Sequence, residues 1–262
     1  MTNHTTTTYL IKKEPLGFER IIFRGCLLVS ALVALYFLTK FAAGNISNVL
    51  TQEKMQVPEL MSALLQCFLG AIVLYVPMLV SKVTKIRIPD ALCSFYYVFA
   101  LCGTIFGEAF SFYYAVPHWD SVLHFSSGIM AGMIGGILVV TFLQKKKCEK
   151  LISPVVIVFS IICIGICVGV VWEIYEFSMD TLLGVNMQKW MFQDGTSLVG
   201  QAALVDTMKD LIIDLAGAIA AAISACSSLK QRKGWLYSYL KITSIETSDK
   251  FVDRKEALPY SA

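Results

Sequence analysis

Charged residues are scarce in this chain, and their scarcity excludes several classes of protein. Asp, Glu, Lys and Arg make up only 16% of the 262 residues, against about 25% in soluble domains. Apolar residues make up 56%, more than a disordered chain or a soluble nucleic-acid-binding protein carries. The formal net charge of +3 indicates no strong attraction to polyanions. No nucleic-acid partner is therefore expected.

Long apolar runs are the dominant feature of the sequence. Crossing a bilayer takes about 20 apolar residues, and six runs of that order lie at 21–43, 60–80, 91–113, 120–143, 153–177 and 204–227. An unpaired backbone N–H or C=O group is too costly in lipid, so a membrane-spanning segment is either a helix or a strand of a closed barrel. These runs lack the alternation of apolar and polar residues that barrel strands show. The sequence predicts an all-α, polytopic integral membrane protein with six transmembrane helices, in contact with the lipid bilayer of the plasma membrane.

Basic residues predict the orientation, because they gather in the short loops that stay in the cytoplasm. All but four of the 22 Lys and Arg residues lie before or at the start of the first run, between the second and third, between the fourth and fifth, or after the sixth. The four exceptions are Lys40, Lys54, Lys189 and Lys209. Both termini are therefore expected in the cytoplasm. The first run is read as a retained helix, with a signal peptide cleaved near Ala43 as the alternative.

The predicted organisation has four parts. Residues 1–20 form a cytoplasmic arm, 21–80 a pair of helices that carry almost no ionisable group, 91–227 a four-helix region with a polar core, and 228–262 a cytoplasmic tail. Small residues recur every fourth position at Gly128, Gly132 and Gly136, and again at Gly165 and Gly169. This spacing lets helix backbones approach closely in lipid.

Seven acids and one histidine lie in the predicted outer halves of the last four helices. The set comprises Glu108 in 91–113, Asp120 and His124 in 120–143, Glu173 and Glu176 in 153–177, and Asp206, Asp210 and Asp214 in 204–227. A charge at mid-membrane costs about 2.5–3.5 kcal/mol, less near the interface, so these residues need a reason to be there. Within one helix they are three or four residues apart, which places them on one stripe.

Acids crowded in this way are relieved by protonation, by bound metal or by water, and Lys209 and His124 are the expected nearby cations. Carboxylates with one imidazole suit a divalent cation such as Mg, Mn, Ca or Zn. The candidate metal ligands are Asp120, His124, Glu173, Glu176, Asp210 and Asp214, and the candidate catalytic residues are His124, Glu173, Asp210 and Asp214. Alternatively, Asp120 and Asp206 cap or stabilise the starts of their helices.

The predicted outer loop at 178–203 is the longest connection. Trp190, Met191 and Phe192 indicate a partly buried lid or interfacial element over the acidic set. Asn186 and Gln188 are further polar residues assigned to the cluster. The chain has no GxxxxGK[ST], GxGxxG, HExxH or GxSxG motif that would indicate a soluble enzyme.

An ordered set of motifs supports a family resemblance. GEAFSFYY (107–114), WDSVLHFSSG (119–128), VVWEIYEF (170–177), NMQK (186–189) and VDTMKDLIIDLAGA (205–218) resemble bacterial membrane proteins of the YjdF type. More distantly, the chain is similar to VanZ-like proteins. The resemblance covers roughly 100–222 and implies a multi-pass inner-membrane protein whose polar residues include the set above. It implies no established catalytic role.

Three functions follow as hypotheses. The first is a metal-dependent hydrolase or transferase acting on an envelope lipid or lipid-linked substrate at an outward-facing site. The second is a structural, interaction or resistance-type membrane protein in which the polar residues form a packing network. The third, a proton- or cation-coupled transporter, is the least favoured, because the inner halves of the last three helices contain no acid.

The predicted orientation is testable with reporter fusions to the C-terminus of the full chain. Because the basic loops are expected in the cytoplasm, a green fluorescent protein fused after Ala262 should fluoresce, and an alkaline phosphatase fused there should be inactive in a bacterial host. Active phosphatase with a dark fluorescent fusion would reverse the orientation.

Overall fold

The computed structural model describes residues 17–51, 57–84, 86, 88–146, 153–192 and 194–240. Within them the chain is almost wholly helical, with one isolated antiparallel bridge between Met191 and Ser197. The elements are α1 (Phe18–Thr51), α2 (Val57–Val73), α3 (Val76–Thr84), α4 (Asp90–Leu101), the π-helix η1 (Cys102–Ala109), α5 (Phe112–Ala115), α6 (Trp119–Lys145), α7 (Pro154–Leu183), the 3-10 helix η3 (Gly200–Leu204) and α8 (Val205–Lys230).

Six helical segments in the described part of the chain are long and apolar enough to cross a membrane, which confirms the predicted number. They are Phe18–Lys40, Leu64–Thr84, Asp90–Ala109, Trp119–Gln144, Pro154–Leu183 and Gly200–Lys230. The second consists of α2 and α3, which meet at a turn just before Pro77. Proline has no amide hydrogen and its ring crowds the preceding turn, which accounts for the break.

Two helix ends differ from the predicted runs. The run at 91–113 ends earlier, because α4 continues as a π-helix only to Ala109, and Ser111 then takes a left-handed conformation. The run at 153–177 ends later, because α7 continues to Leu183 and stops at Gly184, which has a positive φ of 67°. Glycine adopts that conformation without strain and commonly ends helices. Asp180 therefore lies inside α7 and not in the outer loop.

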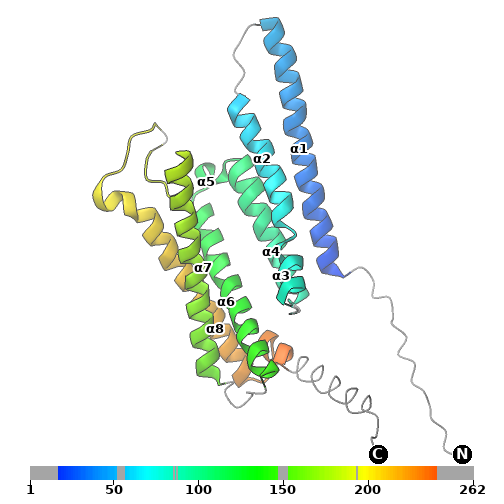
Figure 1. Cartoon of the computed structure of the whole chain (residues 1–262), viewed down its shortest axis with the longest axis vertical. Coiled ribbons are helices and arrows are strands. Elements are labelled where there is room, and N and C mark those ends of the chain that lie inside the picture. The colour runs from blue at the N-terminus through cyan, green and yellow to red at the C-terminus, as the bar shows by residue number, and fades with distance from the viewer. Residues whose placement is uncertain are drawn as a thin grey trace, which may run out of the picture.

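The helices form two groups (Figure 1). α6, α7 and α8 pack against one another along their lengths, and α1, α2, α4 and η1 form the second group beside them. The groups meet where α4, η1 and α5 touch α6. In Figure 1 the start of α1 and the end of α8 both lie toward the lower end, as an even number of crossings requires. Which end faces the cytoplasm stays a prediction.

Glycines bring α6, α7 and α8 into close contact. The small-residue spacing predicts close approach of the helices that carry Gly128 and Gly165, and in the structure both glycines lie against α8. A Cβ on Gly128 of α6 would run into the backbone carbonyl of Asp214 on α8, and one on Gly217 of α8 would run into the carbonyl of Phe125 on α6. A Cβ on Gly165 of α7 would meet the Ala218 side chain of α8. The three helices therefore meet with almost nothing between them near their acidic ends.

The opposite end of the same three helices is filled by apolar side chains. Its fully buried members are Ile137, Val140, Ile157, Ile161, Ala225 and Leu236, the last from the short helical turn at 235–240. The buried hydroxyl pair of Thr141 and Tyr239 lies among them, 2.9 Å apart. This apolar packing leaves the acidic end as the polar end of the group.

We predict that replacing Gly128 with Ala destabilises the protein by about 1–3 kcal/mol, because the added methyl forces α6 away from α8. Gly25 on α1 is the matched control, since a Cβ there has nothing within 4 Å. Gly25→Ala should be neutral or stabilising, as alanine is the better helix former. Thermal unfolding of detergent-purified variants measures both. Equal melting temperatures for the two variants would contradict the backbone contact.

Candidate functional site

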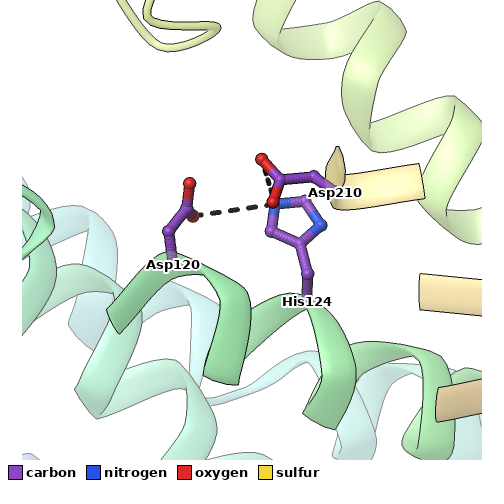
Figure 2. Close-up of side chains that lie close together, drawn as sticks. All are labelled: Asp120, His124 and Asp210. Atoms are coloured by element: carbon purple, nitrogen blue, oxygen red, sulfur yellow. Dashed lines mark ion pairs between the residues drawn. The ribbon is translucent and has the colours of Figure 1, made fainter. Parts of the chain in front are cut away.

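Asp120, His124 and Asp210 meet at the polar end of the three-helix group (Figure 2). Asp120 and His124 lie one turn apart on α6, and Asp210 approaches from α8. The Nε2 atom of His124 is 3.7 Å from Oδ1 of Asp120 and 3.8 Å from Oδ2 of Asp210. These three candidate ligand atoms all lie within 4.8 Å of one another. No other trio of His, Cys, Asp and Glu in the described residues meets that distance.

The ring of His124 is oriented from its other side. Its Nδ1 is 3.0 Å from Oδ2 of Asp214, and the hydroxyl of Ser127 donates to Oδ1 of the same carboxylate at 2.6 Å. Asp214 is completely buried and His124 is 5% exposed. A carboxylate that accepts from one ring nitrogen sets the tautomer and leaves the other nitrogen as a lone-pair donor. The Nε2 lone pair then faces Asp120 and Asp210.

Asp210 carries an unsatisfied oxygen. Its side chain is 1% exposed, and its Oδ1 has no hydrogen-bond partner among the described residues. A buried carboxylate without partners is costly, so such an oxygen needs a proton or a cation to complete it. Of the three residues, Asp210 is therefore the one whose carboxylate a bound proton or cation would stabilise most.

Lys189, from the loop after α7, supplies the fixed positive charge of the site. Its ammonium pairs with Oδ2 of Asp120 and lies 3.1 and 3.2 Å from the two oxygens of Asp206. Lys209, the lysine expected nearby, forms no ion pair with the described residues and acts on Asp206 only through its charge. Burial lowers the pKa of Lys189, but Asp120 and Asp206 outweigh that effect and raise it above its usual range.

Asp180 holds the loop that carries Lys189. Its two oxygens accept the backbone N–H groups of Met187, at 2.7 Å, and Gln188, at 3.0 Å. Asn186 and Met191 close the loop with a pair of hydrogen bonds of 2.8 and 3.1 Å. Four hydrogen bonds from side chain to backbone in a short segment leave it little freedom. The predicted lid is thus tied down at its base, while Phe192 at its edge is 59% exposed.

Glu173 and Glu176 of α7 are buried beside the trio but are not part of it. The amide of Gln188 donates to Oε2 of Glu173 at 3.1 Å and to the hydroxyl of Thr207 at 2.9 Å. Oε1 of Glu173 has no partner among the described residues. Glu176 accepts from the indole N–H of Trp172 at 2.8 Å. The structure therefore separates the six candidate metal ligands into three that converge, Asp214 behind them, and two neighbouring glutamates.

Glu108 lies at the end of η1 and is exposed. Its carboxylate makes no hydrogen bond or ion pair with the described residues, but it lies within electrostatic range of Asp120. One expectation needs correction. The N-cap residue of α6 is His118, so Asp120 does not cap that helix, and its carboxylate pairs with Lys189 instead. Asp206 lies in the first turn of α8, where the helix dipole stabilises a negative charge.

The trio fits a small divalent cation. Zinc lies about 2.0–2.2 Å from imidazole nitrogens and carboxylate oxygens, so two tetrahedral ligands are about 3.4 Å apart. The measured separations from His124 Nε2 exceed this by a few tenths of an ångström, which a small side-chain adjustment closes. The donor set of two carboxylates and one imidazole, with the second nitrogen of His124 held by Asp214, matches the common arrangement of a metal-binding histidine.

The fold and the site define a multi-pass integral membrane protein with a buried Asp and His cluster. The chain belongs to the family described as "Predicted membrane protein (DUF2238)", whose model matches residues 26–231. An uncharacterized protein of Thermotoga maritima is 30% identical over 149 residues, covering 54% of this chain and 65% of that relative. The match thus spans just under two thirds of the relative's length. No solved structure matches, and neither match names VanZ-like proteins.

Two residues of the site escaped the sequence analysis although a signal for each was present. Asp180 continues the stripe of Glu173 and Glu176 by one more turn, which indicates that the helix extends past 177. Lys189 adjoins Gln188 in the NMQK segment, one of the few basic residues on the predicted outer side. Because basic residues are rare on that side, a lysine there indicates an ion pair with the acids of the same side.

We predict that Asp180→Ala releases the loop, because two backbone N–H groups lose their acceptor. Hydrogen exchange at Met187 and Gln188 should quicken at least tenfold, since each bond contributes about 1.5–3 kcal/mol when its acceptor is charged. Asp194→Ala is the control: Asp194 is exposed and accepts only the N–H of Thr196 nearby. Unchanged exchange at Met187 and Gln188 in the Asp180 variant would refute this account of the loop.

Proposed function

We propose that Asp120, His124 and Asp210 bind a divalent cation, and that this centre makes the protein a metal-dependent hydrolase or transferase. One observation carries the proposal: Oδ1 of the buried Asp210 has no partner among the described residues, while Oδ2 of the same carboxylate faces Nε2 of His124, whose Nδ1 is taken by Asp214. A divalent cation would complete both groups at once. The site's own charges favour this, since four aspartates face one lysine and one histidine.

The donor set favours Zn²⁺ or Mn²⁺. Imidazole suits zinc and other transition metals better than it suits Mg²⁺ or Ca²⁺, which prefer oxygen ligands alone. Three protein ligands leave a coordination position for water, which is the arrangement of catalytic zinc sites. A metal bound there would lower the pKa of that water toward neutrality.

Glu173 is the proposed general base of the centre. Gln188 holds one of its oxygens, at 3.1 Å, so that the other, which has no partner among the described residues, is available to accept a proton. Glu173 lies within electrostatic range of His124 and Asp206. A carboxylate that is fixed on one side and free on the other is suited to proton transfer.

The proposed substrate is an envelope lipid or a lipid-linked molecule. The cluster lies within the first two turns of α6 and α8 and near the end of α7, at one end of the membrane-spanning segments. Around it, Leu182, Leu183 and Phe192 are 77%, 64% and 59% exposed. Exposed apolar side chains at this level suit contact with lipid. Leu182 and Leu183 end α7 just after Asp180, and Phe192 follows Lys189 by three residues.

A purely structural role for the cluster is the second candidate. The hydrogen bonds of Asp180, Gln188 and Asp214 form a network that would fix helix packing without any reaction. Transport is less favoured, because apolar packing fills the other end of α6, α7 and α8. We also propose the finer family assignment to the YjdF type, since the whole motif-bearing segment, 107–218, lies within the matched residues 26–231.

Metal analysis of detergent-purified protein tests the metal centre. Wild-type protein dialysed against Zn²⁺ and then against metal-free buffer should retain about one ion per chain, and His124→Ala should retain none. Asp210→Asn should retain little but fold normally, since the amide can satisfy the buried site without a cation. Elemental analysis gives the stoichiometry and thermal unfolding gives the stability.

His118 provides the control for the histidine variant, because it lies near the start of the same helix and is exposed. His118→Ala should bind like wild type. A structural role predicts the opposite pattern for Asp210→Asn: metal-free wild-type protein, and a variant that loses stability or fails to accumulate. That result would reject the metal centre and support the network.

A further inference from the structure

The two oxygens of Asp120 have different partners. Oδ2 pairs with the ammonium of Lys189, and Oδ1 faces Nε2 of His124 at 3.7 Å. The carboxylate is only partly exposed, with 16% of its side-chain surface accessible. Lys189 therefore decides which oxygen of Asp120 points into the trio.

Lys189 is itself held from two directions. Asp206 contacts its Nζ with both oxygens, at 3.1 and 3.2 Å. Its backbone has a φ of 48°, a left-handed conformation that residues other than glycine adopt rarely and at some cost. The residues just before it are tied to Asp180, and those around it are closed by the bonds between Asn186 and Met191. The loop thus holds the ammonium group of Lys189 in one position, between Asp120 and Asp206.

His124, the other candidate ligand on α6, is oriented in the same way as Asp120. Asp214 takes one nitrogen of His124 and directs the other into the trio, just as Lys189 takes one oxygen of Asp120 and directs the other. Partners that orient metal ligands in this way typically contribute 10–100-fold to metal affinity.

We propose that Lys189 is a positioning residue of the metal centre, which orients Asp120 toward the cation from the loop after α7. This inference rests on the proposed function, because it assumes that the trio binds metal. It makes the loop a part of the site and explains why four hydrogen bonds fix a short segment.

A competing effect has the opposite sign. An ammonium close to a divalent cation repels it, so a lysine that acted only through its charge would weaken metal binding, and removing it would strengthen binding. A positioning residue does the reverse, because its loss frees Asp120 to rotate out of the trio. The direction of the change in affinity therefore distinguishes the two roles.

The experiment measures Zn²⁺ affinity by competition with a chromophoric chelator, using full-length protein in detergent. We expect Lys189→Met to weaken Zn²⁺ binding 10–100-fold and Lys189→Arg to weaken it less, because the guanidinium still pairs with Asp120. Lys209→Met is the matched control: Lys209 lies one helix position before Asp210 but forms no ion pair in the described structure. Its affinity should stay within twofold of wild type.

A double-mutant cycle tests whether Lys189 acts through Asp120. In an Asp120→Asn background, Lys189→Met should cause no further loss of Zn²⁺ affinity. The visible spectrum of Co²⁺ bound to Lys189→Met should match that of Asp120→Asn, because both lose the same ligand. A lysine that only supports folding would not produce this match.

The outcomes separate the two proposals. If wild type binds Zn²⁺ and needs His124, but Lys189→Met binds equally well or better, the positioning role is wrong and the metal centre stands. If wild type binds no Zn²⁺, both proposals fail. If Lys189→Met does not fold, Lys189→Gln replaces it, because its side chain has no charge to pair with Asp120: unchanged Zn²⁺ affinity and an unchanged Co²⁺ spectrum in that variant would overturn the inference.

Discussion

The contact between the backbones of α6 and α8 is the constraint on which the site depends. Gly128 faces the carbonyl of Asp214, and Gly217 faces that of Phe125. With no side chains to separate the helices, Asp214 lies directly against α6, and Gly169 of α7 leaves room for its carboxylate on the third side. His124, one turn before Gly128, then meets Asp214 at hydrogen-bond distance. The close packing of α6 against α8 therefore sets the orientation of the His124 imidazole ring.

The charge balance of the cluster is uneven in space. Toward the loop, Asp120 and Asp206 share the ammonium of Lys189. Toward the helix interior, Asp214 is satisfied by His124 and Ser127. Between these two compensated regions lies Asp210, with an oxygen that has no partner among the described residues. Because a buried unpaired carboxylate is costly, this middle position is where a proton or a cation lowers the free energy most.

The sequence predicts the membrane-spanning helices and the polar stripes well, for a physical reason. Long apolar runs and spacings of three or four residues are local properties, and lipid permits few other structures. The convergence of Asp120, His124 and Asp210 also needs Gly217 of α8, which stands outside the every-fourth-residue glycine spacing that predicts close packing. Three of the six candidate metal ligands converge, and the other three lie beside them.

The parts that could not be predicted depend on irregular backbone. Lys189 reaches Asp120 across 69 residues, because a loop without periodicity folds back over the helix ends. The π-helix at Cys102–Ala109, which carries Glu108 near its end, is a second irregular element that the apolar run at 91–113 does not indicate. Both cases turn on local geometry that residue spacing does not encode. The long outer connection was predicted as a lid, whereas its first residues form the base of the site.

The apolar packing below the cluster has an electrical consequence. His124 is the sixth residue of α6, so the trio lies about 7.5 Å along the helix, about a quarter of a 30 Å hydrocarbon core. A divalent cation that enters from the polar end therefore crosses only about a quarter of the transmembrane voltage. At about 2.3 kcal/mol per unit charge per 100 mV for a full crossing, that is about 1 kcal/mol. Occupancy of the centre would change only several-fold between an energised and a depolarised membrane.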